Sequence, residues 1–275
     1  MNGRIIKIIS NDYFVLSDNK TYICKSRGKF RKENISPKVG DYVFFDDKNN
    51  YILEVKERFN TLDRPVVSNI EQAFIITSLK HPDFSSNLLD KLLVVCLLNK
   101  IEPVIVLTKK DLLKKDEYKK LKNVIKYYKK IGFKVLYNTE KWKIKRNFKN
   151  KTTVFTGQTG AGKSSLLNRL DKTLNFEVNE ISEALGRGKH TTRYTTLVPM
   201  YKGFVLDTPG FSDIDLSIYT KEQIRDAFIE FNKISCPYKD CMHTFEKECE
   251  IKKEVGNKIL KSRYENYLKF IKKLV

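Results

Sequence analysis

Nine consecutive residues have types and a spacing that suit the binding of phosphate. They follow the apolar run from Thr152 to Phe155 and match the pattern GxxxxGK[ST]. In this pattern glycines let backbone N–H groups turn toward a β-phosphate, the lysine reaches the β- and γ-oxygens, and the following serine hydroxyl binds Mg²⁺. We therefore predict a strand, a phosphate loop and a helix start, with the nucleotide bound by Gly157, Gln158, Thr159, Gly160, Ala161, Gly162, Lys163, Ser164 and Ser165.

A second motif lies upstream and indicates which base is bound. An apolar run from Glu102 ends in Thr108, Lys109, Lys110 and Asp111, which resemble the [NT]KxD motif of GTPases. In that family the aspartate accepts hydrogen bonds from the guanine N1–H and 2-amino groups, and the lysine stem lies against the base. A lone TKxD in a lysine-rich chain is more often a surface turn, but its position at a strand end favours guanine recognition. The motif implies GTP rather than ATP.

A third motif ends the apolar run that begins at Phe204. Its sequence, Asp207-Thr-Pro-Gly210, has the DxxG pattern. In GTPases such an aspartate holds Mg²⁺ through water, and the glycine N–H meets the γ-phosphate. We predict that Asp207 and Gly210 bind GTP.

A segment between the phosphate loop and DxxG, residues 186–193, has the composition of a mobile switch loop. Thr192 is the expected second Mg²⁺ ligand beside Ser164, and its place in the TTR pattern favours it over Thr191. The motif order, TKKD before the phosphate loop before DxxG, is a circular permutation of the ordinary GTPase order. Because chain ends lie close together at a domain surface, such a permutation leaves the nucleotide site intact.

The region after DxxG contains four metal-binding side chains within fourteen residues, spaced Cys-x4-Cys-x-His-x5-Cys. Ordinary thiols in a reducing cytosol are the alternative interpretation. The clustering favours one structural Zn²⁺, because Cys3His sites are closed and tetrahedral. The predicted ligands are Cys236, Cys241, His243 and Cys249. Cys24 and Cys96 lie in apolar stretches and are expected to be inert core residues.

The permuted motifs and the Cys3His cluster together resemble the small ribosomal subunit biogenesis GTPases of the RsgA family, also called YjeQ or YloQ. The resemblance covers nearly the whole chain. It implies an N-terminal OB-fold, a central permuted GTPase domain and a C-terminal zinc domain that bind the decoding region of the small subunit late in its maturation. It also implies GTP hydrolysis stimulated by that subunit, with 16S rRNA and ribosomal proteins as partners.

The residue that orients the attacking water is not a glutamine, because Phe211 follows DxxG directly. A phenylalanine cannot hydrogen-bond water, so we expect slow intrinsic hydrolysis that a partner accelerates. His190 in the switch segment is the candidate catalytic residue, since a neutral imidazole accepts a proton near pH 7. A His190 that only contacts RNA is the alternative.

Composition and net charge restrict the expected location and binding partners of the protein. The chain has 275 residues, a hydrophobic content of 41% and a formal net charge of +20. No apolar stretch is long enough to span a membrane and no secretory segment starts the chain, so a cytoplasmic protein without membrane contact is expected. The charge favours polyanions such as RNA, although genome base composition also produces lysine-rich chains. No heptads are visible, and we expect a monomer.

The elements fall into three predicted domains. Residues 1–65 contain five short strand-like runs and turns, typical of an OB-fold barrel that binds RNA. Residues 66–215 alternate buried strands with helices, as in a doubly wound α/β domain. Residues 216–275 are expected to be helical and to bind zinc, with a capping box at Thr220 before a helix to Phe231 and one helix over 252–275.

The sequence alone leaves three alternative interpretations open. Basic residues in the loop 25–32 and in the connector 141–151 either contact RNA or are simply solvated. An ATP-dependent phosphotransferase is a second possible class, against which Asp111 argues. A third is an RNA-binding scaffold that uses GTP only for stability, with little turnover.

Overall fold

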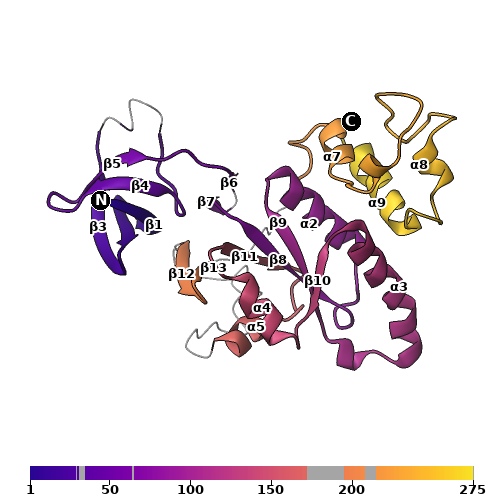
Figure 1. The fold of residues 1–275 in the computed structure, drawn as a ribbon, viewed down its shortest axis with the longest axis horizontal. Coiled ribbons are helices and arrows are strands. Elements are labelled where there is room, and N and C mark those ends of the chain that lie inside the picture. The colour runs from indigo at the N-terminus through magenta and orange to yellow at the C-terminus, as the bar shows by residue number, and fades with distance from the viewer. Residues whose placement is uncertain (29, 31–34, 64, 172–194, 208–214, 275) are drawn as a thin grey trace, which may run out of the picture. The chain divides into compact units, whose positions relative to one another are not determined.

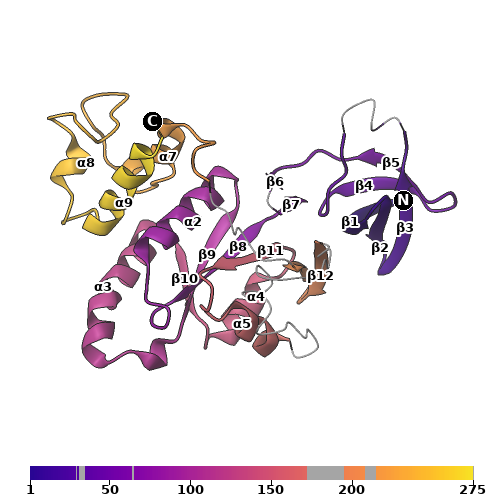
Figure 2. The same ribbon diagram turned by 180° about the vertical axis from the view of Figure 1, so that it is seen from behind.

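The computed structural model describes residues 1–28, 30, 35–63, 65–171, 195–207 and 215–274. Their contacts group the chain into two compact units, which Figure 1 and Figure 2 show from opposite sides. Unit 1 comprises Met1–Ala73, Trp142–Thr156 and Glu177–Ser212. Unit 2 comprises Phe74–Lys141, Gly157–Phe176 and Asp213–Val275. The three predicted domain boundaries are not tested by this grouping and remain predictions.

Unit 1 begins with a closed five-stranded barrel, as the sequence predicted. Its strands run in the order β1-β2-β3-β5-β4, and β4 pairs back with β1. All pairings in it are antiparallel except that of β3 with β5. The strands are β1 (Asn2–Ile9), β2 (Asp12–Ser17), β3 (Lys20–Ser26), β4 (Tyr42–Asp46) and β5 (Tyr51–Val55).

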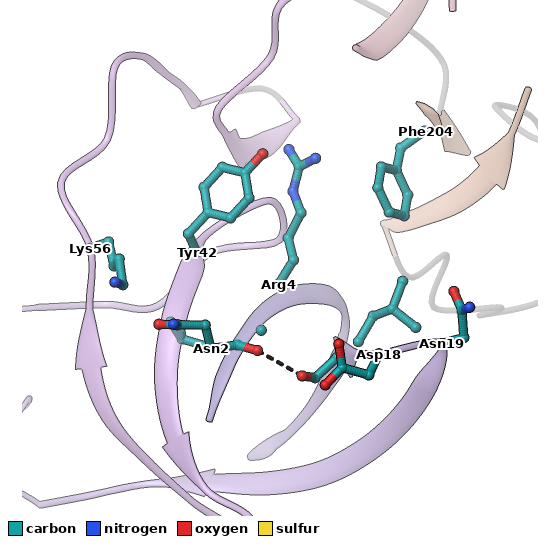
Figure 3. Close-up of a pocket in the computed structure, with 11 residues that line it drawn as sticks. Asn2, Arg4, Asp18, Asn19, Tyr42, Lys56 and Phe204 are labelled. Carbon is teal, nitrogen blue, oxygen red and sulfur yellow. Dashed lines mark hydrogen bonds between the residues drawn. The ribbon is translucent and has the colours of Figure 1, made fainter. Parts of the chain in front are cut away.

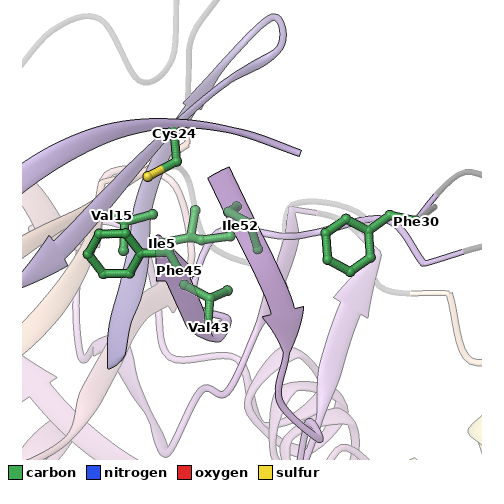
Figure 4. Close-up of a cluster of buried hydrophobic side chains, with 7 residues drawn as sticks. All are labelled: Ile5, Val15, Cys24, Phe30, Val43, Phe45 and Ile52. Atoms are coloured by element: carbon green, nitrogen blue, oxygen red, sulfur yellow. The ribbon is translucent and has the colours of Figure 1, made fainter. Parts of the chain in front are cut away.

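The barrel closes around one apolar cluster, drawn in Figure 4. Side chains alternate along each strand, so in β4 Val43 and Phe45 point inward while Tyr42 and Phe44 are each 41% exposed. Cys24 belongs to this core, and burial raises the pKa of its thiol to about 11. The predicted inert role of this cysteine is thereby supported. The cluster consists of Ile5, Val15, Cys24, Phe30, Val43, Phe45 and Ile52.

A two-residue turn joins β2 to β3 where the sequence predicted a tight reversal. Asp18 and Asn19 have φ values of 47° and 61°. Two successive positive φ angles match the right-handed twist of the strands, and Asp and Asn tolerate them better than most residues. The turn therefore sets the register of this hairpin.

The remaining strands of unit 1 extend the sheet from the barrel in the order β11-β13-β12-β1. β11 (Thr152–Gly157) pairs in parallel with β13 (Gly203–Asp207), and β12 (Thr196–Met200) pairs antiparallel with both β13 and β1. A separate hairpin is formed by β6 (Thr61–Asp63) and β7 (Val66–Ser68).

The basic segment 141–151, predicted as a connector, contains the helix α4 (Lys141–Asn147). Ile144 and Phe148 are completely buried, whereas Trp142 is 70% exposed. The apolar residues lie four apart on one helix face, and that face anchors the segment. The sequence reading missed this helix because the apolar positions are few among many lysines.

Unit 2 contains the strand order β10-β9-β8. The strands are β8 (Gln72–Ser78), β9 (Glu102–Thr108) and β10 (Lys134–Tyr137). Between them run α2 (Ser86–Leu98) and α3 (Lys115–Ile131), and α5 (Lys163–Leu170) follows the phosphate loop. Ser85 caps α2 by accepting the Leu88 N–H at 3.2 Å. Cys96 is fully buried in α2, as expected of a core residue.

The C-terminal region of unit 2 is less helical than predicted. The Thr220 capping box is present, but α7 (Lys221–Asp226) ends early and a 3-10 turn, η2 (Phe231–Lys233), follows. The predicted single helix over 252–275 is wrong: the structure has α8 (Glu250–Lys253) and α9 (Lys261–Lys272). Gly256, at φ 91°, breaks the helix between them. Within the described part of the chain, every helix is too short or too polar to cross a bilayer.

Candidate nucleotide site and metal centre

The phosphate loop connects the end of β11 to the start of α5. Two of its positions have backbone conformations that favour glycine. Gly157 has φ 131°, and a Cβ there would lie 2.1 Å from the Ile76 carbonyl oxygen. Gly162 is the N-cap of α5 at φ 93°. Both conformations are strained for residues with a side chain. The loop is therefore held against β8, with the free N–H groups of the α5 N-terminus at its end.

Lys163 extends back across this loop. Its ammonium donates hydrogen bonds to the carbonyl oxygens of Gly157 at 2.8 Å and Gln158 at 3.0 Å. Burial lowers the pKa of this ammonium below its ordinary value. A half-buried cation beside a helix N-terminus attracts anions, because both charge and dipole favour them. Ser164, the predicted Mg²⁺ ligand, is buried in the first turn of α5.

The predicted guanine motif lies against the same loop. Thr108, the last residue of β9, donates from Oγ1 to the Ala161 carbonyl at 2.7 Å across 53 positions of sequence. Lys109 donates from Nζ to the Gly160 carbonyl at 2.8 Å and also to the His81 carbonyl. The structure thus brings the first two motifs together within unit 2. Asp111 follows in the 3-10 turn η1 (Lys110–Leu112), where it is exposed.

The other predicted nucleotide residues lie in unit 1 or outside the described part of the chain. Asp207 is the last residue of β13 in unit 1. Gly210, His190 and Thr192 lie outside the described residues. Their assignments, like the roles of all the site residues, remain predictions.

The four predicted metal ligands converge in unit 2. Their ligand atoms all lie within 4.8 Å of one another. Cys249 Sγ is 3.4 Å from His243 Nδ1, and Cys236 Sγ is 3.7 Å from that nitrogen and 3.9 Å from Cys249 Sγ. Zn–S and Zn–N bonds of about 2.3 and 2.0 Å place tetrahedral ligand atoms about 3.5 to 3.8 Å apart. The donor set and its spacing therefore fit zinc.

The protonation states of these side chains also bear on a metal. Burial lowers the pKa of His243, which keeps its imidazole neutral as ligation requires. Burial raises the pKa of Cys241 to about 12. A buried thiolate without a metal is therefore disfavoured, and a cation would have to stabilise it.

A residue that the sequence reading missed shapes the loop around the metal ligands. The Glu246 carboxylate accepts the N–H groups of Met242 and Thr244, both at 2.7 Å. Lys252 donates to the carbonyl oxygens of Thr244 at 3.1 Å and Glu246 at 3.0 Å. Tyr264 of α9 donates to the His243 carbonyl at 2.7 Å. The only signal in the sequence was the position of an acidic residue between two ligands.

A cavity of about 620 Å³ in unit 1, shown in Figure 3, is lined by the barrel and β13. Arg4 lies in it between the rings of Tyr42 and Phe204, 4.7 and 5.1 Å from their centroids. Its guanidinium donates to the carbonyl oxygens of Gly40 at 3.2 Å and Asn69 at 3.0 Å. Burial lowers the pKa of Arg4. These contacts make Arg4 a structural link between barrel strands and β13.

Comparisons with known proteins agree with this geometry. A family model for the RsgA GTPase matches residues 49–217, and one for the RsgA N-terminal domain matches residues 2–52. The small ribosomal subunit biogenesis GTPase RsgA 2 of Oceanobacillus iheyensis is 44% identical over 283 residues, covering 99% of this chain and 97% of that protein. The corresponding RsgA protein of Streptococcus mutans is 45% identical, covering 100% and 95%.

Two solved structures are similar over nearly the whole chain. The crystal structure of YloQ, described as a circularly permuted GTPase, has a TM-score of 0.85 at 35% identity, covering 99% of this chain and 94% of that one. The crystal structure of YjeQ from Thermotoga maritima has a TM-score of 0.86 at 31% identity, covering 99% and 98%. The predicted order of barrel, permuted GTPase domain and C-terminal metal cluster is thus confirmed, and the chain belongs to the RsgA family of GTPases.

Proposed function

We propose that this chain hydrolyses GTP during late maturation of the small ribosomal subunit, and that hydrolysis times its release from the subunit. One observation carries the nucleotide part: Thr108 and Lys109 bond directly to the backbone of the phosphate loop. These bonds support the proposal that the guanine motif and the phosphate loop bind the two ends of one guanine nucleotide. The names of the relatives, which are small ribosomal subunit biogenesis GTPases, support the biological setting.

In this proposal the backbone of residues 157–165 surrounds the phosphates and Lys163 neutralises their charge. Asp111 accepts hydrogen bonds from the guanine edge. Ser164 and Thr192 would hold Mg²⁺, which neutralises charge on the transferred phosphoryl group. Asp207 and Gly210 would sense the γ-phosphate.

Hydrolysis needs a residue that positions water. We assign this role to His190, because Phe211 follows the DxxG motif and offers no hydrogen-bonding group. The ribosomal particle would bring the switch segment into place, so that turnover depends on the partner. This dependence separates a timed GTPase from a GTP-stabilised RNA-binding scaffold with little turnover.

We further propose that the metal bound by Cys236, Cys241, His243 and Cys249 is one Zn²⁺ with a structural role. These four side chains would supply a complete tetrahedral shell, which would leave no position for substrate. The partner surface is expected to be 16S rRNA near the decoding region together with ribosomal proteins. The net charge of +20 favours such a polyanion. A cytoplasmic monomer without membrane contact is the expected state.

The test is GTP turnover by the purified protein alone, with small ribosomal subunits and with large ribosomal subunits. We expect strong stimulation by small subunits only. Stimulation by neither particle would refute the timed GTPase and favour the scaffold. Competition between GTP and ATP for binding tests the base preference separately, and an equal affinity for both would refute guanine recognition.

A further inference from the structure

The third residue of the guanine motif has a contact that its sequence position does not suggest. Lys110 places its ammonium 4.5 Å from the ring centroid of Tyr118 and 5.0 Å from that of Tyr137. A cation over two aromatic faces is held by the quadrupoles of both rings. Lys110 is therefore bound in one place although it lies at the surface.

The two rings are themselves joined. Their hydroxyl oxygens lie 3.0 Å apart in a hydrogen bond. This bond lowers the pKa of Tyr118, and the Lys110 ammonium lowers it further. Burial and the same hydrogen bond raise the pKa of Tyr137. The hydroxyl–hydroxyl bond therefore ties the two rings that flank the ammonium to each other.

Each of the three residues comes from a different element at this end of the sheet. Lys110 begins η1, Tyr118 lies in the first turns of α3, and Tyr137 ends β10. The helix is fixed in turn, because Glu117 accepts the Lys114 N–H at 2.8 Å and pairs with Lys80 at 2.6 Å. The two tyrosines thus provide a rigid support for η1.

The neighbours of Lys110 in the motif bond to other partners. Thr108 and Lys109 bond to the phosphate loop, whereas Lys110 contacts the rings of Tyr118 in α3 and Tyr137 in β10. Asp111 comes next in the same short turn and makes no hydrogen bond or ion pair to the described chain from its carboxylate. Only the backbone of η1 therefore orients that carboxylate.

We propose that Lys110 is a positioning residue for guanine recognition, and that the Tyr118–Tyr137 pair holds it so that the next residue, Asp111, faces the base. The inference rests on the proposed guanine-binding role of Asp111. It adds a specificity-determining contact that does not itself touch the nucleotide.

The test compares GDP with inosine diphosphate, which lacks the 2-amino group, by isothermal titration calorimetry. A misplaced Asp111 carboxylate loses most of its bond to the 2-amino group. Lys110→Met removes the charge at similar length, and we expect it to reduce the preference for GDP over inosine diphosphate about five-fold, on the scale of a cation–π contact to two rings. Lys110→Arg keeps a cation that stacks on tyrosine and should retain the wild-type preference.

Lys120→Met is the matched control, because this exposed lysine of α3 is removed with the same change in net charge. It should leave the preference unchanged. An unchanged preference for GDP over inosine diphosphate in Lys110→Met would overturn the inference. If both affinities fall equally, the role of Lys110 is merely structural, and if neither falls, Lys110 has no role in binding.

Asp111→Asn separates failure of this inference from failure of the proposed function. If Asp111→Asn abolishes the GDP preference while Lys110→Met does not change it, guanine recognition stands and only the positioning role is wrong. If Asp111→Asn keeps the full preference, the assignment of the guanine reader itself is wrong.

Discussion

A buried charge network joins α9 to α2, and breaking it should destabilise this part of unit 2 strongly. Arg263 of α9 is 0% exposed and donates to Asp90 of α2 at 2.6 Å. It also pairs with Glu230, which is 4% exposed. Asp90 accepts further bonds from Tyr128 at 2.6 Å and from Asn266 at 2.7 Å. Arg263→Met keeps the packing volume but removes the only cation among these residues.

The expected loss of unfolding free energy follows from the buried charges that remain after the substitution. Removing one partner of a buried ion pair costs about 3–5 kcal/mol, because the other charge stays buried without compensation. Arg263→Met leaves two carboxylates in this position. Tyr128 and Asn266 still donate to Asp90, so we expect about 4 kcal/mol rather than a larger sum.

The deficit should depend on pH with a defined sign. Burial raises the pKa of Asp90, and Arg263 is the largest influence that opposes this rise. In the variant the folded-state pKa therefore lies further above the ordinary value of about 4. A carboxyl group with a raised folded-state pKa favours folding at low pH, and this contribution is lost as pH rises through that value. Arg263→Met should thus be closer to wild type at pH 5 than at pH 8.

Native-state hydrogen exchange of peptides from α2 and α9 measures this effect, because it reports the opening free energy of that part of the chain. Lys269→Met, at an exposed position of α9, is the matched control and should stay within about 0.5 kcal/mol of wild type. A loss below about 1 kcal/mol at pH 8 for Arg263→Met, or the opposite pH trend, would refute the reasoning.

Three further predictions concern the site. Gly157→Ala forces a Cβ to 2.1 Å from the Ile76 carbonyl oxygen and should abolish GDP binding in calorimetry, whereas Gly28→Ala, with open space around its Cβ, should bind normally. Cys241→Ser should lose its metal in elemental analysis, where the wild type should hold one zinc per chain, and a metal-free wild type would contradict the assignment. Burial lowers the pKa of Lys163, so the affinity for GDP should begin to weaken at a lower pH than the titration of an exposed lysine would give. Lys163→Arg should show no such pH dependence of GDP affinity. Parallel pH profiles of GDP affinity in the wild type and in Lys163→Arg would exclude Lys163 as the cause.

Secondary structure followed from the sequence where a local pattern was complete. The strand runs of the barrel, the Thr220 capping box and the helix after the phosphate loop appear as predicted. The single helix predicted over 252–275 is not present. One glycine in a segment with otherwise helical propensity was too weak a signal to predict the break at Gly256. α4 was not predicted because its buried face has only two apolar residues, Ile144 and Phe148, among many lysines, and their burial is visible only in the tertiary structure.

The sequence by itself indicated which residues could bind phosphate and metal, and the tertiary structure decided which distant side chains hold those residues in place. Phosphate loops and metal clusters can be recognised in a sequence because backbone geometry and ligand number restrict each position to few residue types. Lys110 between two tyrosines, and Arg263 bonded to Asp90 across 173 positions, have no such local signature. Lysine and arginine are compatible with almost any surface turn or helix, so only the packing of distant elements selects their partners.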